Sequence, residues 1–159
     1  EVTNAKTIEI KFSDLGNLII MQSALPSLDL TGTVIHKKLA LGSNKWAKDA
    51  TLTMRGTETK SLNDKVDSWP DVIDLRGFAY ADTFALGTGS DNFTERDVKW
   101  FKDWLSKQTQ YTPQPYKQLA SVLISAGHRS EAEEILIEGK ERERASSASP
   151  VLLTFQNIL

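Results

Sequence analysis

Short runs in which apolar and polar residues alternate recur along the first half of the chain. They read IEIKF from Ile8, LDLTG from Leu28, LTMRG from Leu52 and IDLRG from Ile73, and their starts lie 20, 24 and 21 residues apart. Alternation with a period of two is the pattern of a β-strand with one buried face. A strand that returns at this interval is typical of a solenoid, in which every coil adds a rung to one continuous core.

Weaker apolar runs, LII from Leu18 and LALG from Leu39, lie half-way between these strands and supply a second side to the coils. Gly32, Gly56 and Gly77 follow three of the strong runs at the same place, where the chain needs a positive φ or a close backbone approach. A β-sandwich fits less well, because its strands recur at about 8 to 12 residues and its hairpins use turns such as Asn-Gly, which this sequence lacks.

The segment TETKSLNDKVDSWPD, between the third and fourth strong runs, breaks this pattern. Because it is mostly polar, we predict a loop that bulges from one coil. Trp69 and Pro70 lie near its end, and we expect them to fold back over the loop as an apolar cover.

From Thr94 onward the apolar period changes from two to about 3.6, the period of an α-helix. The motif TERD makes Thr94 the expected N-cap and Asp97 its capping-box partner, which predicts a helix over residues 95–107. The helix is broadly apolar, so we expect it to cover the open end of the solenoid, where core and strand edges would otherwise face water. Its apolar residues are Val98, Trp100, Phe101, Trp104 and Leu105.

A second helix is predicted from the stretch TPQPY. Thr112 can cap it, and Pro113 and Pro115 fit its first turn, where a missing N–H costs nothing. Gly127 is expected to end it in left-handed geometry. The prolines therefore mark the start of a helix.

A third helix is predicted after a turn at His128 and Arg129, with Ser130 as N-cap and Glu133 as capping-box partner. Its expected buried face consists of Ala132, Ile135, Leu136 and Gly139. The second and third helices together have the size of one tetratricopeptide-type repeat. Such a repeat is rarely stable alone, so the pair should pack on the first helix and the solenoid.

These patterns predict an α+β fold: a short, irregular, right-handed β-solenoid of three to four coils, capped by a three-helix C-terminal module. We assign residues 1–86 to the solenoid coils, 87–93 to a linker and 94–145 to the helical cap with its tetratricopeptide-like pair. Residues 146–159 form an apolar tail, which we expect to be truncated because the chain turns apolar as it stops.

The run YTPQPYKQLASVLISAGHRSEAEEILIEGKERER, with SWPDVIDLRGFAYADTF upstream, resembles the C-terminal region of a group of uncharacterised bacterial proteins, some labelled membrane-associated or oxidoreductase-like. The similarity covers Leu52 to Arg144, and the pattern PQPY...LA...AGH...EA is its most specific part. The resemblance implies a repeat-built β-solenoid closed by this helical module, often followed by a membrane-directed tail. It carries over no catalytic residue.

Composition narrows the classes of function. The 159 residues are 40% hydrophobic and 25% charged, as in one globular domain. The net charge of −2 is spread along the chain, which disfavours nucleic-acid binding. The absence of cysteine excludes disulfides and thiolate ligands and favours a reducing compartment. With no long apolar run and no signal-peptide core in the sequence, we expect a soluble, cytoplasmic protein.

Candidate chemistry on the solenoid lies on its outward face. Asp29 and Asp74 occupy equivalent outward positions, and Arg55 and Arg76 lie two residues beyond the outward positions of their own coils. A carboxylate beside an arginine row could bind or protonate a sugar. Alternatively, these side chains are the solvated face of alternating strands, with Thr53 between the two acids, and we favour this interpretation.

Tyr111 and His128 are the surface candidates of the helical module. Tyr111 belongs to a tyrosine pair that could form a sugar or peptide platform, although such aromatics more commonly cover a core. His128 lies 92 residues from His36, the other histidine, and we expect no metal site. Gly87 and Gly89 lack the third glycine of a dinucleotide-binding loop, and we expect no cofactor.

Two classes of function remain open. The first is a non-enzymatic scaffold or protein-interaction module, which docks through the solenoid face or the helical pair and contacts the inner face of the cytoplasmic membrane only through a segment missing from this chain. Its partner is a protein or a second copy, and not a nucleic acid. The second is a carbohydrate-active hydrolase or lyase. An enzyme requires a cleft where Asp74, Arg76 and another acid converge, whereas a scaffold shows a flat ladder.

Overall fold

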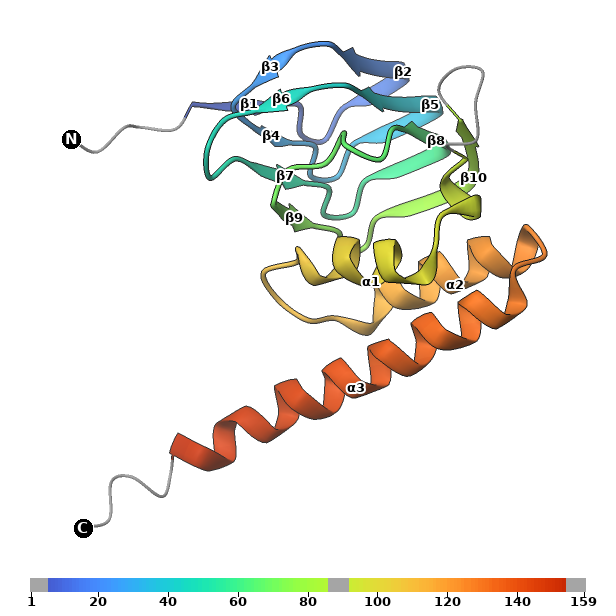
Figure 1. Ribbon diagram of the computed structural model, residues 1–159. Helices are drawn as coiled ribbons and strands as arrows, with labels where there is room; N and C mark the ends of the chain where they lie inside the picture. Colours follow the sequence, from blue (N-terminus) through green and yellow to red (C-terminus); the bar gives the residue numbers. More distant parts are fainter. Residues whose placement is uncertain (1–5, 86–91, 154–159) are drawn as a thin grey trace.

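The computed structural model describes residues 6–85 and 92–153. About four coils of parallel strands are stacked on one another, and three helices close the end formed by the last coil (Figure 1). The predicted α+β fold, a short β-solenoid with a helical C-terminal module, is confirmed.

One sheet contains the four strong alternating runs. It is formed by β1 (Thr7–Glu9), β4 (Ser27–Asp29), β7 (Thr51–Thr53) and β9 (Val72–Asp74), all parallel and in this order. The register aligns Ile8, Leu28, Leu52 and Ile73 in one row, and the last three are no more than 1% exposed. The interval between the runs therefore predicted the register of the sheet.

A second parallel sheet forms the next side of the coils. It contains β2 (Asp14–Met21), β5 (Val34–Gly42), β8 (Glu58–Asp64) and β10 (Ala79–Ala85). A third, two-stranded sheet of β3 (Ala24–Leu25) and β6 (Lys45–Trp46) adds a side to the first two coils. Each coil thus returns to the first sheet one strand spacing further along, about 4.8 Å.

The turn between the first two sheets has left-handed backbone geometry in every coil. Gly32, Gly56 and Gly77 have φ values of 67°, 63° and 72°, and Phe12 occupies the equivalent place in the first coil with φ 48°. The amide of Phe12 donates to Thr31 O, and those of Gly32 and Gly56 donate to the carbonyls of the following coils. The glycine positions follow from this repeated backbone conformation.

Strand β8 corrects the prediction that residues 57–71 form a loop. In the second sheet its inward positions are Thr59, Leu62 and Asp64, which align with Ile35, Leu39 and Leu41 of β5. Because two of these three are polar, the alternation is invisible in the sequence. Only the segment after Asp64 is irregular, and there Trp69 and Pro70 are buried, as expected.

The first helix begins later than predicted. A short 3-10 helix, η1 (Phe93–Glu95), precedes α1 (Val98–Ser106). The N-cap is Asp97, whose Oδ1 accepts the amide of Trp100 at 2.8 Å, and not Thr94, which is buried. The prediction of Thr94 was wrong because burial of Phe93 fixes Thr94 within the 3-10 turn.

Helix α2 (Pro113–Ser125) begins as predicted, with Thr112 at the N-cap position and proline in the first turn, but the Thr112 side chain makes no capping hydrogen bond. Gly127, with φ 93°, donates to Ile124 O, and the next amide, of His128, donates to Leu123 O. This pair of bonds is a Schellman motif.

Helix α3 (Arg129–Leu153) departs from its prediction in three ways. It begins at Arg129, so Ser130 lies in its first turn and donates to Glu131 instead of capping. Leu136 is 36% exposed, because α2 contacts the side that carries Ala132, Ile135 and Gly139. The helix also continues through residues 146–153, the first part of the predicted tail. Residues 154–159, like residues 87–91 of the predicted linker, lie outside the described residues.

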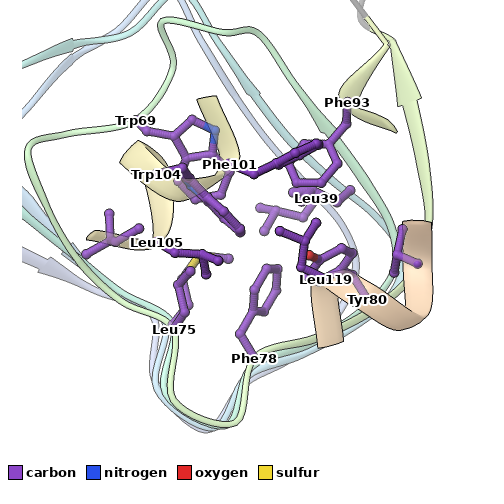
Figure 2. Close-up of a cluster of buried hydrophobic side chains, with 14 of the residues drawn as sticks. Leu39, Trp69, Leu75, Phe78, Tyr80, Phe93, Phe101, Trp104, Leu105 and Leu119 are labelled. Carbon is purple, nitrogen blue, oxygen red and sulfur yellow. The ribbon is translucent and has the colours of Figure 1, made fainter. Parts of the chain in front are cut away.

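One hydrophobic core runs without interruption from the coils into the helices (Figure 2). Trp104 of α1 lies edge-on to Trp69 of the third coil, with ring centroids 5.1 Å apart, and 5.6 Å from Phe93. Leu119 of α2 is fully buried in the same core. The helices therefore cover the apolar interior of the last coil, as a further coil would.

A buried ion pair joins the solenoid to the cap. Arg96, between η1 and α1, donates from Nη1 and Nη2 to the two carboxylate oxygens of Asp64 at 2.9 and 3.0 Å. Trp69 Nε1 donates to the same carboxylate, and the Arg96 guanidinium lies 4.3 Å from the Trp100 ring centroid. The side chains of Arg96 and Asp64 are only 5% and 0% exposed. This bidentate contact balances a charge that would otherwise face the apolar interior.

We predict that Arg96→Leu lowers the free energy of unfolding by about 3–5 kcal/mol, because it leaves the Asp64 carboxylate buried without its guanidinium. The double variant Asp64→Leu/Arg96→Leu should lose less than the single variant. Urea unfolding followed by circular dichroism measures both. Arg144→Leu, on the exposed part of α3, is the control, and an equal loss in Arg96→Leu and this control would contradict the prediction.

Candidate functional site

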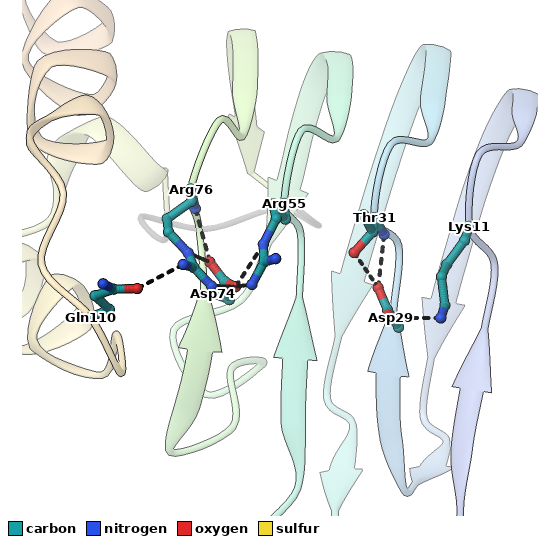
Figure 3. A network of polar contacts seen from close by, with 7 residues as sticks. All are labelled: Lys11, Asp29, Thr31, Arg55, Asp74, Arg76 and Gln110. Atoms are coloured by element: carbon teal, nitrogen blue, oxygen red, sulfur yellow. Dashed lines mark hydrogen bonds and ion pairs between the residues drawn. The ribbon is translucent and has the colours of Figure 1, made fainter.

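The outward charged residues of the solenoid lie along one edge of the first sheet, at the ends of its strands (Figure 3). The register aligns Asp29, Thr53 and Asp74 across three consecutive strands. Arg55 and Arg76 extend from the residues that follow β7 and β9. Four of the sequence-predicted residues are therefore on one face.

Asp74 is enclosed by guanidinium groups. Arg76 donates from Nε to Oδ1 at 2.8 Å and from Nη2 to Oδ2 at 2.6 Å. Arg55, from the preceding coil, donates to Oδ2 from Nε at 3.3 Å and from Nη2 at 3.0 Å. The Arg76 amide also donates to Oδ1, at 3.2 Å. With five donors on two oxygens and a side chain only 9% exposed, the carboxylate is saturated.

These contacts fix the charge state of Asp74. The hydrogen bonds from Arg76, and after them those from Arg55, outweigh the effect of burial and lower the pKa of Asp74 to about 2. A general acid needs a carboxyl group whose pKa lies near the working pH. Asp74 is instead ionised throughout the physiological range, so it can neither donate a proton nor readily release its partners to a ligand.

Asp29 belongs to a separate cluster. Its Oδ1 accepts hydrogen bonds from the amide and hydroxyl of Thr31, and its Oδ2 lies 3.4 Å from Lys11 Nζ. Burial opposes ionisation, but the Thr31 hydrogen bonds and the Lys11 charge together outweigh it and lower the pKa of Asp29. The strand of Thr53 lies between Asp29 and Asp74, which puts them about two strand spacings, or about 10 Å, apart.

Neither carboxylate therefore has the properties of the proton donor in a two-carboxylate glycosidase, which needs a raised pKa. Both pKa values are lowered, and the two acids are held by different basic residues. The charged ladder therefore consists of two separate groups of intramolecular ion pairs, with Lys11–Asp29 between the first and second coils and Arg55–Asp74 between the third and fourth. These ion pairs stabilise the stacking of the coils that they join.

The two candidates of the helical module lie near opposite ends of α2, which is about 20 Å long. Tyr111 precedes the helix and packs beside Tyr116, with ring centroids 5.7 Å apart. His128 follows the helix, and its Nε2 lies 3.4 Å from Glu95 Oε1. The structure therefore does not bring Tyr111 and His128 together.

The residues around Tyr111 form a shallow hollow of about 300 Å³ between α2 and α3. Gly139 forms part of its floor, where a Cβ atom would lie 3.0 Å from the Tyr116 ring. Burial raises the pKa of Tyr116, and also that of Tyr111, so both stay neutral at physiological pH. The hollow thus presents aromatic and aliphatic surface, flanked by Lys117 and Lys140.

Sequence reasoning missed the glutamines that close the last coil. Gln114 accepts the Gly77 amide on Oε1 at 2.9 Å and donates from Nε2 to Phe78 O at 3.0 Å. Gln118 Nε2 donates to Tyr80 O at 2.7 Å. These side-chain amides occupy the place of the next strand's backbone. The spacing of four residues between them, one helical turn, is the only signal in the sequence.

A third glutamine, Gln110, joins the cap to the charged ladder. Its Oε1 accepts a hydrogen bond from Arg76 Nη1 at 2.8 Å (Figure 3). Arg76 therefore contacts both the carboxylate of its own coil and the segment before α2. The end of the ladder and the start of the cap form one polar network.

No cluster of three potential metal ligands occurs within residues 6–85 and 92–153. The glycines Gly87 and Gly89, weighed as a nucleotide loop, lie outside the described residues. His36 lies 2.6 Å from Asp14 Oδ1 on the exposed face of the second sheet.

In comparisons with known proteins, no family model matches the chain, and no curated protein or solved structure shows significant similarity to it.

We predict that Asp74→Asn lowers the free energy of unfolding at pH 7 by about 2 kcal/mol, from the difference between its ordinary pKa of 3.8 and about 2 in the fold. Because the pKa of Asp74 is lower in the folded than in the unfolded chain, its ionised carboxylate stabilises the fold above pH 3.8. This stabilisation is lost as the pH falls toward 2. Urea unfolding between pH 7 and pH 2 should show a loss that is about 2 kcal/mol larger in the wild type than in the variant, in which Asp29 still titrates. Asp82→Asn, at an exposed position, is the control; an equal effect there would contradict the assignment.

We predict that Gln114→Leu destabilises the protein by about 1–2 kcal/mol, because it removes the partners of one backbone N–H and one C=O. Hydrogen exchange of the Gly77 amide should become faster. Lys117→Leu introduces the same residue at an exposed position of the same helix. If both variants show equal stability and equal Gly77 exchange, the glutamine does not close the coil.

Proposed function

We propose that this chain is a non-enzymatic scaffold whose helical pair docks a protein partner. The observation that carries the proposal is the apolar surface of α2 and α3. Ile124 of α2 is 45% exposed, and Leu136 and Ile137 of α3 are 36% and 56% exposed. Of these, Leu136 also lines the hollow at Tyr111 and Tyr116, and aromatic and aliphatic anchors of this kind dominate the energetics of protein interfaces.

The far part of α3 supports a docking role. From Lys140 to Ala148 every residue is exposed, and the helix extends away from the solenoid (Figure 1). Arg142 Nε donates to Glu138 Oε1, one helical turn earlier, at 2.8 Å. A helix that is polar all round and stabilised by such pairs is typical of a segment that bridges to another body.

The charged ladder gives no support to the carbohydrate-active alternative. Asp74 is saturated by Arg55 and Arg76, and Asp29 is held two coils away by Thr31 and Lys11. Glycoside hydrolysis requires a carboxyl group with a raised pKa near a second carboxylate. No observation on the described residues favours this second function.

For the setting of this scaffold, we propose the cytoplasm of a bacterium, with the module at the inner face of the cytoplasmic membrane. The proposal rests on the resemblance to bacterial proteins labelled membrane-associated and on the absence of cysteine, which favours a reducing compartment. Within residues 6–85 and 92–153, no helix has the length and apolar character that a membrane span requires.

We predict that a photocrosslinking amino acid at Ile137 captures one discrete protein partner in a bacterial host, since the exposed apolar side chain lies on the docking surface. The matched position is Lys60, which is also exposed but lies on β8 of the solenoid. Introducing Leu136→Lys into the crosslinking chain should reduce the adduct, because a charge on the apolar surface opposes burial. Equal capture from Ile137 and Lys60, or an adduct insensitive to Leu136→Lys, would overturn the proposal.

A further inference from the structure

The two ends of the solenoid are finished differently. At the C-terminal end, Gln114 and Gln118 bond the backbone of the last coil, and the Ile73 amide donates to Lys107 O at 3.1 Å. At the other end, within the described part of the chain, β1 and β2 are the outermost strands of their sheets, and each has a paired strand on one side only. Among the described residues, no helix packs over this first coil (Figure 1).

The open end exposes the core ladder. Ile8 is 42% exposed, whereas Leu28, its partner in the next coil, is 1% exposed. The other inward residues of the first coil are also only partly buried, although their partners in the second coil are no more than 1% exposed. These residues are Ile10, Leu15, Leu18 and Ile20. The first coil therefore lacks the apolar contacts that a further layer would supply.

Apolar exposure continues on the outside of the same coil. Phe12, Ile19 and Met21 are 79%, 55% and 43% exposed. With Ile8, they are four of the eight large hydrophobic side chains that are exposed in the described structure. Such a concentration of apolar side chains within 14 residues (8–21) is typical of an interaction surface.

The edge of the first coil is self-complementary. The order of residues 8–12 is Ile-Glu-Ile-Lys-Phe, apolar, acidic, apolar, basic, apolar. An antiparallel copy centred on Ile10 would place Ile8 opposite Phe12, Ile10 opposite Ile10, and Glu9 opposite Lys11. Both charged side chains are accessible, with Glu9 59% and Lys11 33% exposed.

The charged side chains at this edge are exposed enough to add such pairs to the contacts that they already make. Lys11 Nζ already lies 3.1 Å from Glu9 Oε1 and 3.4 Å from Asp29 Oδ2, and an ammonium group has three donors. Opposite residues of antiparallel strands have Cβ atoms about 4.5–5.5 Å apart. A Glu9 carboxylate from the other copy would therefore lie within reach of Lys11.

We propose that a second copy of this chain docks on the open end, with the two edges antiparallel about a two-fold axis at Ile10. Each copy then gains backbone partners for its edge and an apolar layer for its first coil, and two Glu9–Lys11 pairs form across the interface. Because the cap blocks the opposite end, the contact closes at a dimer and does not grow into a fibre. This inference is independent of the partner proposed for the helical pair.

Variants that reverse the charge of Glu9 or Lys11 test whether the two-fold axis lies at Ile10. The wild type should sediment as a dimer, and both Glu9→Lys and Lys11→Glu should raise the dimer dissociation constant about tenfold or more, since each opposes like charges twice. Mixing the two variants sets the two basic side chains of one chain against the two acidic side chains of the other. Dimers should then return, visible in native mass spectrometry as heterodimers. A monomeric wild type, or a mixture that stays monomeric, overturns the proposal.

A pair of variants tests the location. Phe12→Lys, at 79% exposure and opposite Ile8 in the proposed contact, should dissociate the dimer, whereas Ile137→Lys, at 56% exposure on α3, should not. Circular dichroism checks that both variants are folded, as expected at exposed positions. Hydrogen exchange of residues 7–12 should slow as the wild-type concentration rises. A dimer that Ile137→Lys dissociates, or whose residues 7–12 gain no protection, uses another surface and overturns the proposal.

Discussion

The contact between Asp64 and Arg96 determines how the two halves of this protein fit together. Asp64 occupies an inward position of the third coil, in register with Leu41, so its carboxylate points where the pattern of the sheet calls for an apolar side chain. A buried carboxylate is costly without a partner. Arg96 supplies that partner from the first turn of the helical module, and its guanidinium is held against Trp100. The solenoid and the cap therefore each contribute one charge to the buried pair that joins them.

The same dependence holds for the backbone. A parallel sheet leaves a row of unpaired amides and carbonyls at each end, and in this protein the last row is closed by glutamine side chains. The charged ladder on the outer face ends at the same place, where Arg76 contacts both Asp74 and Gln110. Of the polar residues that suggest a reactive site in the sequence, Asp74 and Arg76 thus lie where the solenoid meets the helical cap.

Most of the fold could be predicted because it depends on local patterns. The period of two and the interval between runs gave the register of the first sheet, and proline and glycine marked both ends of α2. Strand β8 was missed because its inward residues include Thr59, whose hydroxyl donates to Ser61 O, and Asp64, whose carboxylate pairs with the distant Arg96. Asp29 and Asp74 were placed correctly on one face, but their saturation by basic and hydroxyl partners depends on side-chain directions that spacing does not encode. Gln114 of α2 was overlooked because its partners are backbone atoms of the last solenoid coil.

The glutamine contacts have a consequence for how such a chain can vary. Gln114 and Gln118 bind main-chain atoms of Gly77, Phe78 and Tyr80, so they recognise the path of the last coil and not its side chains. Any coil with the same backbone turn offers the same N–H and C=O groups. These main-chain contacts would therefore survive a change of side chains in the last coil, whereas the packing of Trp104 on Trp69 and the pair of Arg96 with Asp64 would each require a matching residue in the third coil.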